Sequence, residues 1–191
     1  MIISSMNFKG GAGKTMVCTN LATAFVQLLG KKVCLVDTDE SFATTKWAGR
    51  RDERGILPSI SVVQMTESKT IVSSIRQLNE DNDIILIDAP PRLNPLVSKI
   101  ILLSDLIIIP VPPKSGNDRE VTEDFLQRFE AIQEQRTDGG RTPTVLLVNM
   151  MKEGYNLHST FVASLPQLCE DYGITMFATK SFILVSNSVT P

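Results

Sequence analysis

Apolar residues along the chain follow two alternating patterns. Short unbroken runs are typical of strands buried on both faces of a parallel sheet, and longer segments with apolar residues every three to four positions are typical of helices packed on it. The predicted strands are residues 2–6, 33–37, 61–64, 84–88, 106–111, 144–149 and 174–178. The predicted helices are residues 13–29, 71–78, 96–103, 120–134 and 157–172. This alternation predicts an α/β fold with a mostly parallel sheet.

One segment fits neither pattern. The stretch from residue 38 to Arg54 is polar, contains the only tryptophan, Trp47, and is assigned no helix or strand. The chain has no linker long or polar enough to separate two domains. We therefore expect residues 1–191 to form a single domain.

Composition and charge argue against several classes of protein. The chain has 191 residues, with 19 Lys and Arg against 21 Asp and Glu, and its net charge of −2 is not that of a uniformly basic surface. Its three cysteines, Cys18, Cys34 and Cys169, are too scattered for a zinc site and are expected to be buried as reduced thiols. The sequence has no signal peptide and no apolar run long enough to span a membrane. We therefore expect a cytoplasmic protein.

The segment between the first strand and the first helix is rich in glycine and lysine. Its residues are Lys9, Gly10, Gly11, Ala12, Gly13, Lys14 and Thr15, with Met16 following. Glycine lets backbone N–H groups approach an anion, and the helix N-terminus adds unpaired donors and a favourable dipole. In a phosphate-binding loop of this kind Lys14 contacts the β- and γ-phosphates of a nucleotide, and the Thr15 hydroxyl binds Mg²⁺. The usual first glycine is replaced by Phe8, and a second lysine, Lys9, follows it.

This loop resembles the deviant Walker A motif of the ParA/MinD family of P-loop ATPases. The resemblance extends over nearly the whole chain and is greatest to small partition ATPases of the ParF type. It implies a three-layer P-loop NTPase fold, a twisted sheet flanked by helices, that binds ATP, ADP and Mg²⁺. It also implies that Lys9 reaches across an ATP-dependent homodimer to the partner's phosphates, as an arginine finger supplied in trans does.

Acidic residues end two of the predicted strands, at the sheet edge where such a loop lies. Asp37 is the last residue of one strand and Asp39 follows it, and Asp88 is the last residue of the other strand. The resemblance implies that Asp88 is the Walker B aspartate beside Mg²⁺, that Asp39 is linked to the attacking water, and that Asp37 supports the metal. Many partition ATPases continue with proline and glutamine after the second aspartate. This chain has Glu40 and Ser41 there, which leaves the first switch region and the rate of hydrolysis open.

Three further segments match the same family. Residues 89–92 resemble its second switch, and the proline-rich residues 110–113, followed by Asp118, resemble the segment before a helix of the dimer interface. Asn149 ends a predicted strand and matches an asparagine that contacts adenine. On the residues alone, Asn149 is equally well explained as a strand-terminal turn residue.

The resemblance also concerns partners. It implies a centromere-binding, ParB-like protein that stimulates a slow ATPase, and the start of the chain at its first strand predicts no operator-reading extension. Arg136, Arg141, Lys152 and Lys180 are candidates for non-specific DNA binding and nucleoid association, although the net charge of −2 counts against it. Residues 186–191 lack the basic amphipathic helix of MinD relatives, so we expect no membrane attachment.

The sequence therefore predicts a ParA-like partition ATPase. It would bind Mg-ATP, form a nucleotide-sandwich dimer and hydrolyse ATP slowly to drive plasmid or chromosome segregation. Three alternatives stay open: an accessory ATPase of conjugative DNA transfer or of another cargo, an ATP-dependent metabolic P-loop enzyme, and a module that binds nucleotide without turnover. The single histidine offers a metabolic enzyme few acid–base groups, and the unusual residues after Asp39 keep the last alternative open.

Overall fold

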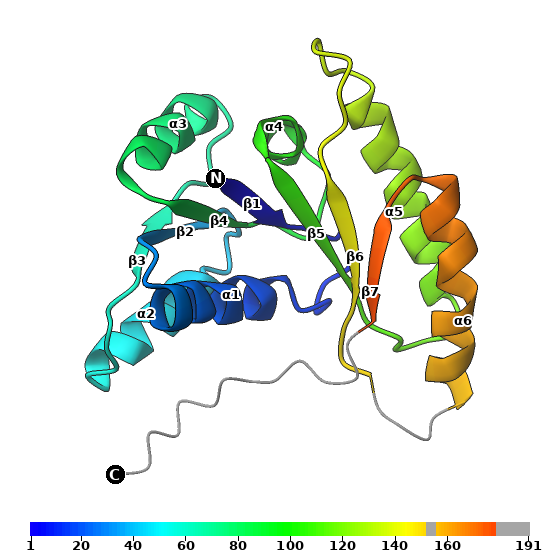
Figure 1. Cartoon of the computed structure of the whole chain (residues 1–191), viewed down its shortest axis with the longest axis horizontal. Coiled ribbons are helices and arrows are strands. Elements are labelled where there is room, and N and C mark those ends of the chain that lie inside the picture. The colour runs from blue at the N-terminus through cyan, green and yellow to red at the C-terminus, as the bar shows by residue number, and fades with distance from the viewer. Residues whose placement is uncertain (152–155, 179–191) are drawn as a thin grey trace.

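The computed structural model describes residues 1–151 and 156–178. In this part of the chain seven parallel strands form one sheet in the order β3-β2-β4-β1-β5-β6-β7 (Figure 1). The strands are β1 (Ile2–Ser5), β2 (Val33–Asp37), β3 (Ser61–Gln64), β4 (Ile84–Asp88), β5 (Leu106–Val111), β6 (Thr144–Val148) and β7 (Thr175–Ala178). The helices are α1 (Lys14–Leu29), α2 (Ala43–Glu53), α3 (Ile71–Asp81), α4 (Pro95–Leu103), α5 (Asp118–Gln133) and α6 (Asn156–Asp171).

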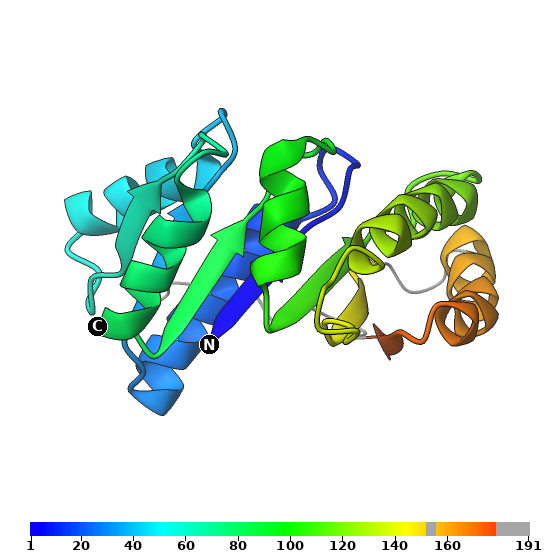
Figure 2. The same cartoon turned by 90° about the horizontal axis from the view of Figure 1, so that it is seen from above.

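Helices cover both faces of the sheet, which makes three layers. Figure 1 and Figure 2 show α1 and α2 on one face and α3, α4, α5 and α6 on the other. On the first face Cys18 and Ala22 of α1 pack against Leu35 of β2. On the second face, Ile75 of α3 and Phe125 of α5 belong to a larger apolar core. The predicted α/β fold, with a parallel sheet flanked by helices, is thus confirmed.

The buried strands explain why the apolar runs are unbroken. Every residue of β1, β2 and β4 is buried, because helices cover these central strands on both sides. The edge strand β3 has only half-buried and exposed positions. Each predicted strand and helix is present. Strands β2, β3, β4 and β5 have the predicted bounds, and the ends of the other predicted elements differ by at most three residues.

The stretch from residue 38 to Arg54 corrects the prediction. It contains a helix, α2, that the sequence pattern did not reveal. Its buried residues are Thr44, Ala48 and Arg51, and two of these three are polar, so the helical period carries no apolar signal. Trp47 packs against the apolar cluster that contains Leu35 of β2. The Arg51 guanidinium carbon lies 5.1 Å from the centroid of the Trp47 ring.

The order of the strands determines where loops converge. The chain leaves the central strand β1 through α1 toward β2 on one side, and β5, β6 and β7 extend the sheet on the other side. In such sheets ligands bind in the crevice outside the carboxyl ends of the strands, where the direction of winding changes. The glycine-rich loop between β1 and α1 lies at that position.

Cys18, Cys34 and Cys169 are all buried as free thiols, as predicted, and burial raises the pKa of each. Within residues 1–151 and 156–178, no helix is both long and apolar enough to cross a membrane.

Candidate functional site

The loop between β1 and α1 depends on glycine at two positions. Gly11 and Gly13 have φ angles of +69° and +98°, in the left-handed region that disfavours other residues. A Cβ at Gly13 would lie 2.2 Å from Nδ2 of Asn149. Gly13 also precedes the first turn of α1, whose backbone N–H groups have no partner within the helix. The loop therefore offers closely spaced N–H donors to an anion.

Phe8, which replaces the usual first glycine, anchors the loop to the core. Its ring meets that of Phe125 edge-on, with the centroids 4.5 Å apart. Next to it, Asn7 donates from Nδ2 to the Pro110 carbonyl over 2.8 Å and accepts from the Lys9 backbone N–H over 2.8 Å. These contacts fasten the base of the loop to β5 and α5.

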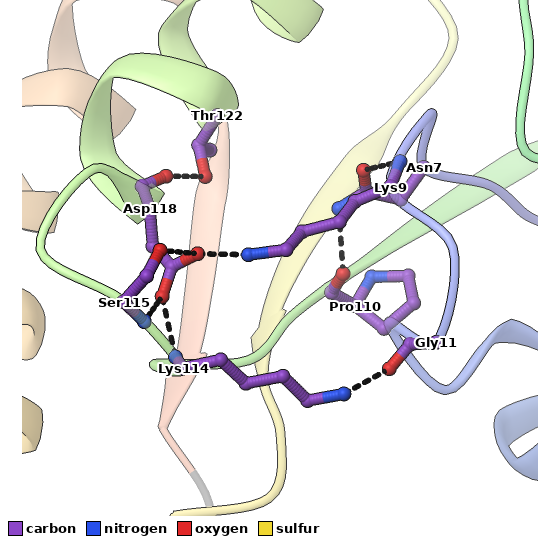
Figure 3. A network of polar contacts seen from close by, with 8 residues as sticks. All are labelled: Asn7, Lys9, Gly11, Pro110, Lys114, Ser115, Asp118 and Thr122. Carbon is purple, nitrogen blue, oxygen red and sulfur yellow. Dashed lines mark hydrogen bonds and ion pairs between the residues drawn. The ribbon is translucent and has the colours of Figure 1, made fainter.

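Lys9 forms an ion pair with Asp118 of the same chain (Figure 3). Asp118 opens α5, and its other carboxylate oxygen accepts from the backbone N–H groups of Lys114 and Ser115. Burial raises the pKa of Asp118, but the hydrogen bonds from Lys9 and these two N–H groups outweigh it and leave the pKa below its ordinary value. Lys114 Nζ in turn donates to the Gly11 carbonyl over 2.7 Å. The segment after β5 thus contacts the glycine-rich loop at two points.

Lys14 lies on the inner side of the loop. Its side chain is buried, and its Nζ donates to the Lys9 carbonyl over 3.4 Å. Burial lowers the pKa of Lys14, whereas the nearby carboxylates of Asp88 and Asp39 raise it. The structure therefore brings together the predicted phosphate-binding lysine and two of the predicted acids.

Asp88 lies beside Thr15, the other predicted Mg²⁺ ligand. Its Oδ2 accepts from the hydroxyls of Thr15 over 2.6 Å and Thr44 over 2.7 Å. Its Oδ1 is buried and has no hydrogen-bond partner among the described residues. Burial is the main cause that raises the pKa of Asp88, to about 6. A buried oxygen without a partner fits the ligand shell of a cation.

The donor set at Asp88 suits Mg²⁺ bound together with a nucleotide. Mg²⁺ is usually held by one or two protein oxygens, with waters and substrate phosphates completing its shell. Thr15 and Asp88 supply such oxygens next to the loop. In residues 1–151 and 156–178 no three His, Cys, Asp or Glu side chains form a cluster suited to a metal ion.

Asp37 and Asp39 occupy different positions at the same sheet edge. Asp37 pairs with Asp88 in the register of β2 and β4, and its Oδ2 accepts from the backbone N–H and the hydroxyl of Thr45. Asp39 is half-buried and lines a cleft of about 400 Å³. Glu40 and Arg92 line the same cleft and form an exposed ion pair of 3.0 Å. Glu40, which departs from the family pattern, thus links the first predicted switch region to Arg92 of the second.

Asn149 contacts the glycine-rich loop. It is buried, donates from Nδ2 to the Ala12 carbonyl over 3.1 Å, and accepts from the Met150 N–H over 2.9 Å. Asn149 therefore holds the glycine-rich loop in place, and its contact with adenine stays a prediction. Met16 lies in the first turn of α1, at the end of the loop.

Two of the four candidate DNA-binding cations are described by the structure, and both lie away from this site. Arg136 and Arg141 lie between α5 and β6, at the edge where the strands begin, and form ion pairs with Asp138 and Glu130. Lys152 and Lys180 lie outside the described residues.

Sequence reasoning missed the side chains that support the motifs from a distance. Thr44 and Thr45 lie in the stretch that was assigned no element, and Lys114 follows the proline-rich segment. Asp118 matched a family segment without an assigned role. No contiguous motif contains these residues, so only the fold could reveal their contacts.

The chain is similar in sequence to known proteins. The chromosome-partitioning ATPase Soj of Thermus thermophilus is 31% identical over 135 residues, which cover 57% of this chain and 53% of Soj. The chain thus spans about half the length of that relative. Maintenance of carboxysome distribution protein A of Halothiobacillus neapolitanus is 24% identical over 177 residues, which cover 91% of this chain and 76% of that protein.

A solved structure and a family model complete the comparison. The structure of a plasmid partition protein of Borrelia burgdorferi bound to AMPPNP has a TM-score of 0.71 at 19% identity, covering 94% of this chain and 86% of that one. The family model described as the CobQ/CobB/MinD/ParA nucleotide binding domain matches residues 3–178. Because that match spans nearly the whole chain, the protein belongs to the ParA/MinD family of nucleotide-binding P-loop proteins.

Proposed function

We propose that this chain is an ATP-driven switch of the partition type. The observation that carries the proposal is the contact between Thr15 and Asp88, 2.6 Å long, at the end of an open glycine-rich loop. A hydroxyl and a carboxylate oxygen that has no partner among the described residues lie near Lys14, and they form the arrangement that Mg²⁺ and a triphosphate need.

Each residue has a place in nucleotide binding under this proposal. The backbone N–H groups of residues 10–16 and the Lys14 ammonium bind the phosphates of ATP or ADP, and Thr15 and Asp88 hold Mg²⁺, with Asp37 in support. Bound Mg²⁺ supplies neutralisation of phosphate charge. The family match and the AMPPNP bound to the Borrelia protein support this assignment.

Lys9 and Asp39 act in dimerisation and hydrolysis. Lys9 leaves Asp118 and contacts the phosphates bound by the partner in a nucleotide-sandwich homodimer. Asp39 orients the water for in-line attack on the γ-phosphate, and catalysis rests on positioning and charge neutralisation, which suits a slow reaction. The half-buried position of Asp39 in an open cleft, close enough to affect the pKa of Lys14, supports this role.

The similarity to named relatives suggests two cellular roles. The likeness to Soj favours plasmid or chromosome segregation in the cytoplasm, with a ParB-like partner that stimulates hydrolysis and with non-specific DNA as a further ligand. The carboxysome distribution protein matches 91% of the chain, more than Soj does, and favours positioning of another cargo as the second candidate. Residues 1–191 act as one domain in both cases.

Sedimentation velocity with and without nucleotide tests the switch. We expect a monomer with ADP and Mg²⁺ and a dimer with a non-hydrolysable ATP analogue. Lys14→Ala should abolish binding in calorimetry, whereas Lys9→Ala should bind nucleotide and fail to dimerise. Lys31→Ala, on an exposed residue after α1, is the matched control. Identical sedimentation in all nucleotide states would contradict the switch and favour a metabolic enzyme or a passive binding module.

Asp39 is tested separately. Asp39→Ala should keep the dimer assembled with ordinary ATP, because hydrolysis no longer disassembles it. A wild-type rate of phosphate release from this variant would remove Asp39 from the mechanism.

A further inference from the structure

Thr44 makes a contact that its own helix does not require. It lies in the first turn of α2 with none of its surface exposed, and its hydroxyl donates to Oδ2 of Asp88, on β4, over 2.7 Å. Threonine hydroxyls within helices usually bond back to a carbonyl of the preceding turn, as Thr23 does with Thr19. The Thr44 hydroxyl instead joins α2 to the sheet.

The two carboxylate oxygens of Asp88 differ in their hydrogen bonds. Oδ2 accepts from both Thr15 and Thr44, and Oδ1 has no partner among the described residues. A carboxylate oxygen accepts about two hydrogen bonds in good geometry, so the two hydroxyls occupy Oδ2. The carboxylate is thereby fixed in rotation, with Oδ1 as the oxygen available to another ligand.

Thr45, the next residue of α2, binds a carboxylate at the end of the adjacent strand β2. Thr45 donates its backbone N–H and its hydroxyl to Oδ2 of Asp37, over 2.8 and 2.9 Å. Asp37 and Asp88 are partners in the register of β2 and β4, so two successive threonines bind two adjacent strand-end carboxylates. Helix α2 begins four residues after Asp39. The start of this helix is therefore connected to the loop that contains Asp39 and to the carboxylates of Asp37 and Asp88.

We propose that Thr44 is a positioning residue for the Mg²⁺ site: its hydroxyl holds the Asp88 carboxylate for the metal and couples metal binding to the position of α2. The inference rests on the proposed function, because it assigns Asp88 to Mg²⁺. Thr44 itself touches neither the metal nor the nucleotide. Thr44 acts on the metal through the Asp88 carboxylate that it holds. It also links that carboxylate to α2, which contains Trp47 about one turn after Thr44.

The test separates the hydroxyl from the shape of the side chain. Thr44→Val keeps the volume and removes the hydroxyl, Thr44→Ser keeps the hydroxyl, and Thr23→Val is the control, since it removes a buried hydroxyl that serves only α1. Thr44→Ala is a second hydroxyl-free variant, should valine disturb folding. Calorimetry measures binding of ADP without Mg²⁺ and then of Mg²⁺ to the ADP complex. Fluorescence of Trp47, the only tryptophan, reports on α2 during the Mg²⁺ titration.

We expect Thr44→Val to bind ADP alone as the wild type does, to lose about fivefold or more in Mg²⁺ affinity, and to lose the Mg²⁺-dependent change in Trp47 fluorescence. Thr44→Ser and Thr23→Val should retain both properties. Wild-type Mg²⁺ affinity in Thr44→Val, or equal losses in Thr44→Ser and Thr44→Val, would overturn the inference and leave the proposed function standing. A wild-type protein that binds no ADP with or without Mg²⁺ would overturn both.

Discussion

Lys9 and Asp118 lie 109 positions apart in the sequence, yet the Lys9 ammonium donates directly to the Asp118 carboxylate within one chain. The Asp118 side chain is almost fully buried, at 3% exposed, while Lys9 is 27% exposed. The lysine that the proposal sends to a partner's phosphates is therefore held by its own chain. If Lys9 contacts the partner's phosphates as proposed, dimerisation exchanges this intramolecular ion pair for an intermolecular contact.

Asp118→Asn should promote the nucleotide-dependent dimer. Asparagine keeps an oxygen for the Lys114 and Ser115 N–H groups, whereas its amide N–H₂ group cannot accept from Lys9. Released Lys9 should lower the protein concentration at half-dimerisation, with a non-hydrolysable ATP analogue, by about threefold. Sedimentation velocity measures this midpoint. Glu123→Gln, which breaks an exposed ion pair on the same helix, is the control, and an unchanged or higher midpoint for Asp118→Asn would contradict the exchange.

The fold was predictable where burial made the pattern simple. Central strands such as β4 are buried throughout and read as unbroken apolar runs. Helix α2 was not predictable, because Thr44 and Arg51 occupy two of its buried positions and hide the apolar period. Both form hydrogen bonds to groups outside the helix: Thr44 donates to Asp88 over 2.7 Å, and Nη2 of Arg51 donates to the Pro58 carbonyl over 3.2 Å.

The candidate site was predictable in the same partial way. Its contiguous motif, residues 9–15, and its strand-end acids could be found because a loop and a strand end are each local in sequence. The partners that orient them are not local: Asp118 meets Lys9, and Thr44 meets Asp88, only because the strand order brings their elements together. No short-range spacing encodes such contacts.

The pH dependence of stability should reveal the burial of Asp88. Its pKa is raised from 3.8 to about 6. The folded protein therefore keeps this proton up to about pH 6, whereas the unfolded chain releases it near pH 4. Unfolding releases the proton in that range, so the contribution of Asp88 to the free energy of unfolding falls as pH rises from 4 to 7, by about 2 kcal/mol, and is constant above it.

Urea denaturation of the nucleotide-free protein at several pH values tests this contribution. Asp88→Asn should gain about 2 kcal/mol of stability relative to the wild type as pH rises from 4 to 7, whatever its stability at a single pH. Asp124→Asn, which removes an exposed carboxylate from α5, is the control. A profile for Asp88→Asn parallel to that of the wild type would show that Asp88 titrates as an ordinary carboxyl group.

Gly13→Ala should prevent the glycine-rich loop from binding nucleotide. Alanine at a φ angle of +98° is strained, and its Cβ would lie 2.2 Å from Nδ2 of Asn149. We expect the melting temperature to fall by about 5 °C or more and nucleotide binding to be lost in calorimetry. Gly10→Ala is the matched control, because no atom lies within 4 Å of its added Cβ. Equal effects of the two substitutions would mean that the left-handed turn at Gly13 does not control the loop.

Arg136 should matter for stability rather than for binding DNA. Its guanidinium donates to the Leu102 carbonyl, to the Thr142 hydroxyl over 2.9 Å and to both Asp138 oxygens, so it fastens the loop between α5 and β6 to α4. Arg136→Ala should lower the melting temperature by about 2–4 °C, and Arg136→Lys should not restore it, because an ammonium cannot reproduce the guanidinium fork. In fluorescence anisotropy with duplex DNA, any affinity of the wild type should persist in both variants with the same salt dependence. A weaker affinity with a shallower salt slope, at an unchanged melting temperature, would instead make Arg136 a phosphate contact.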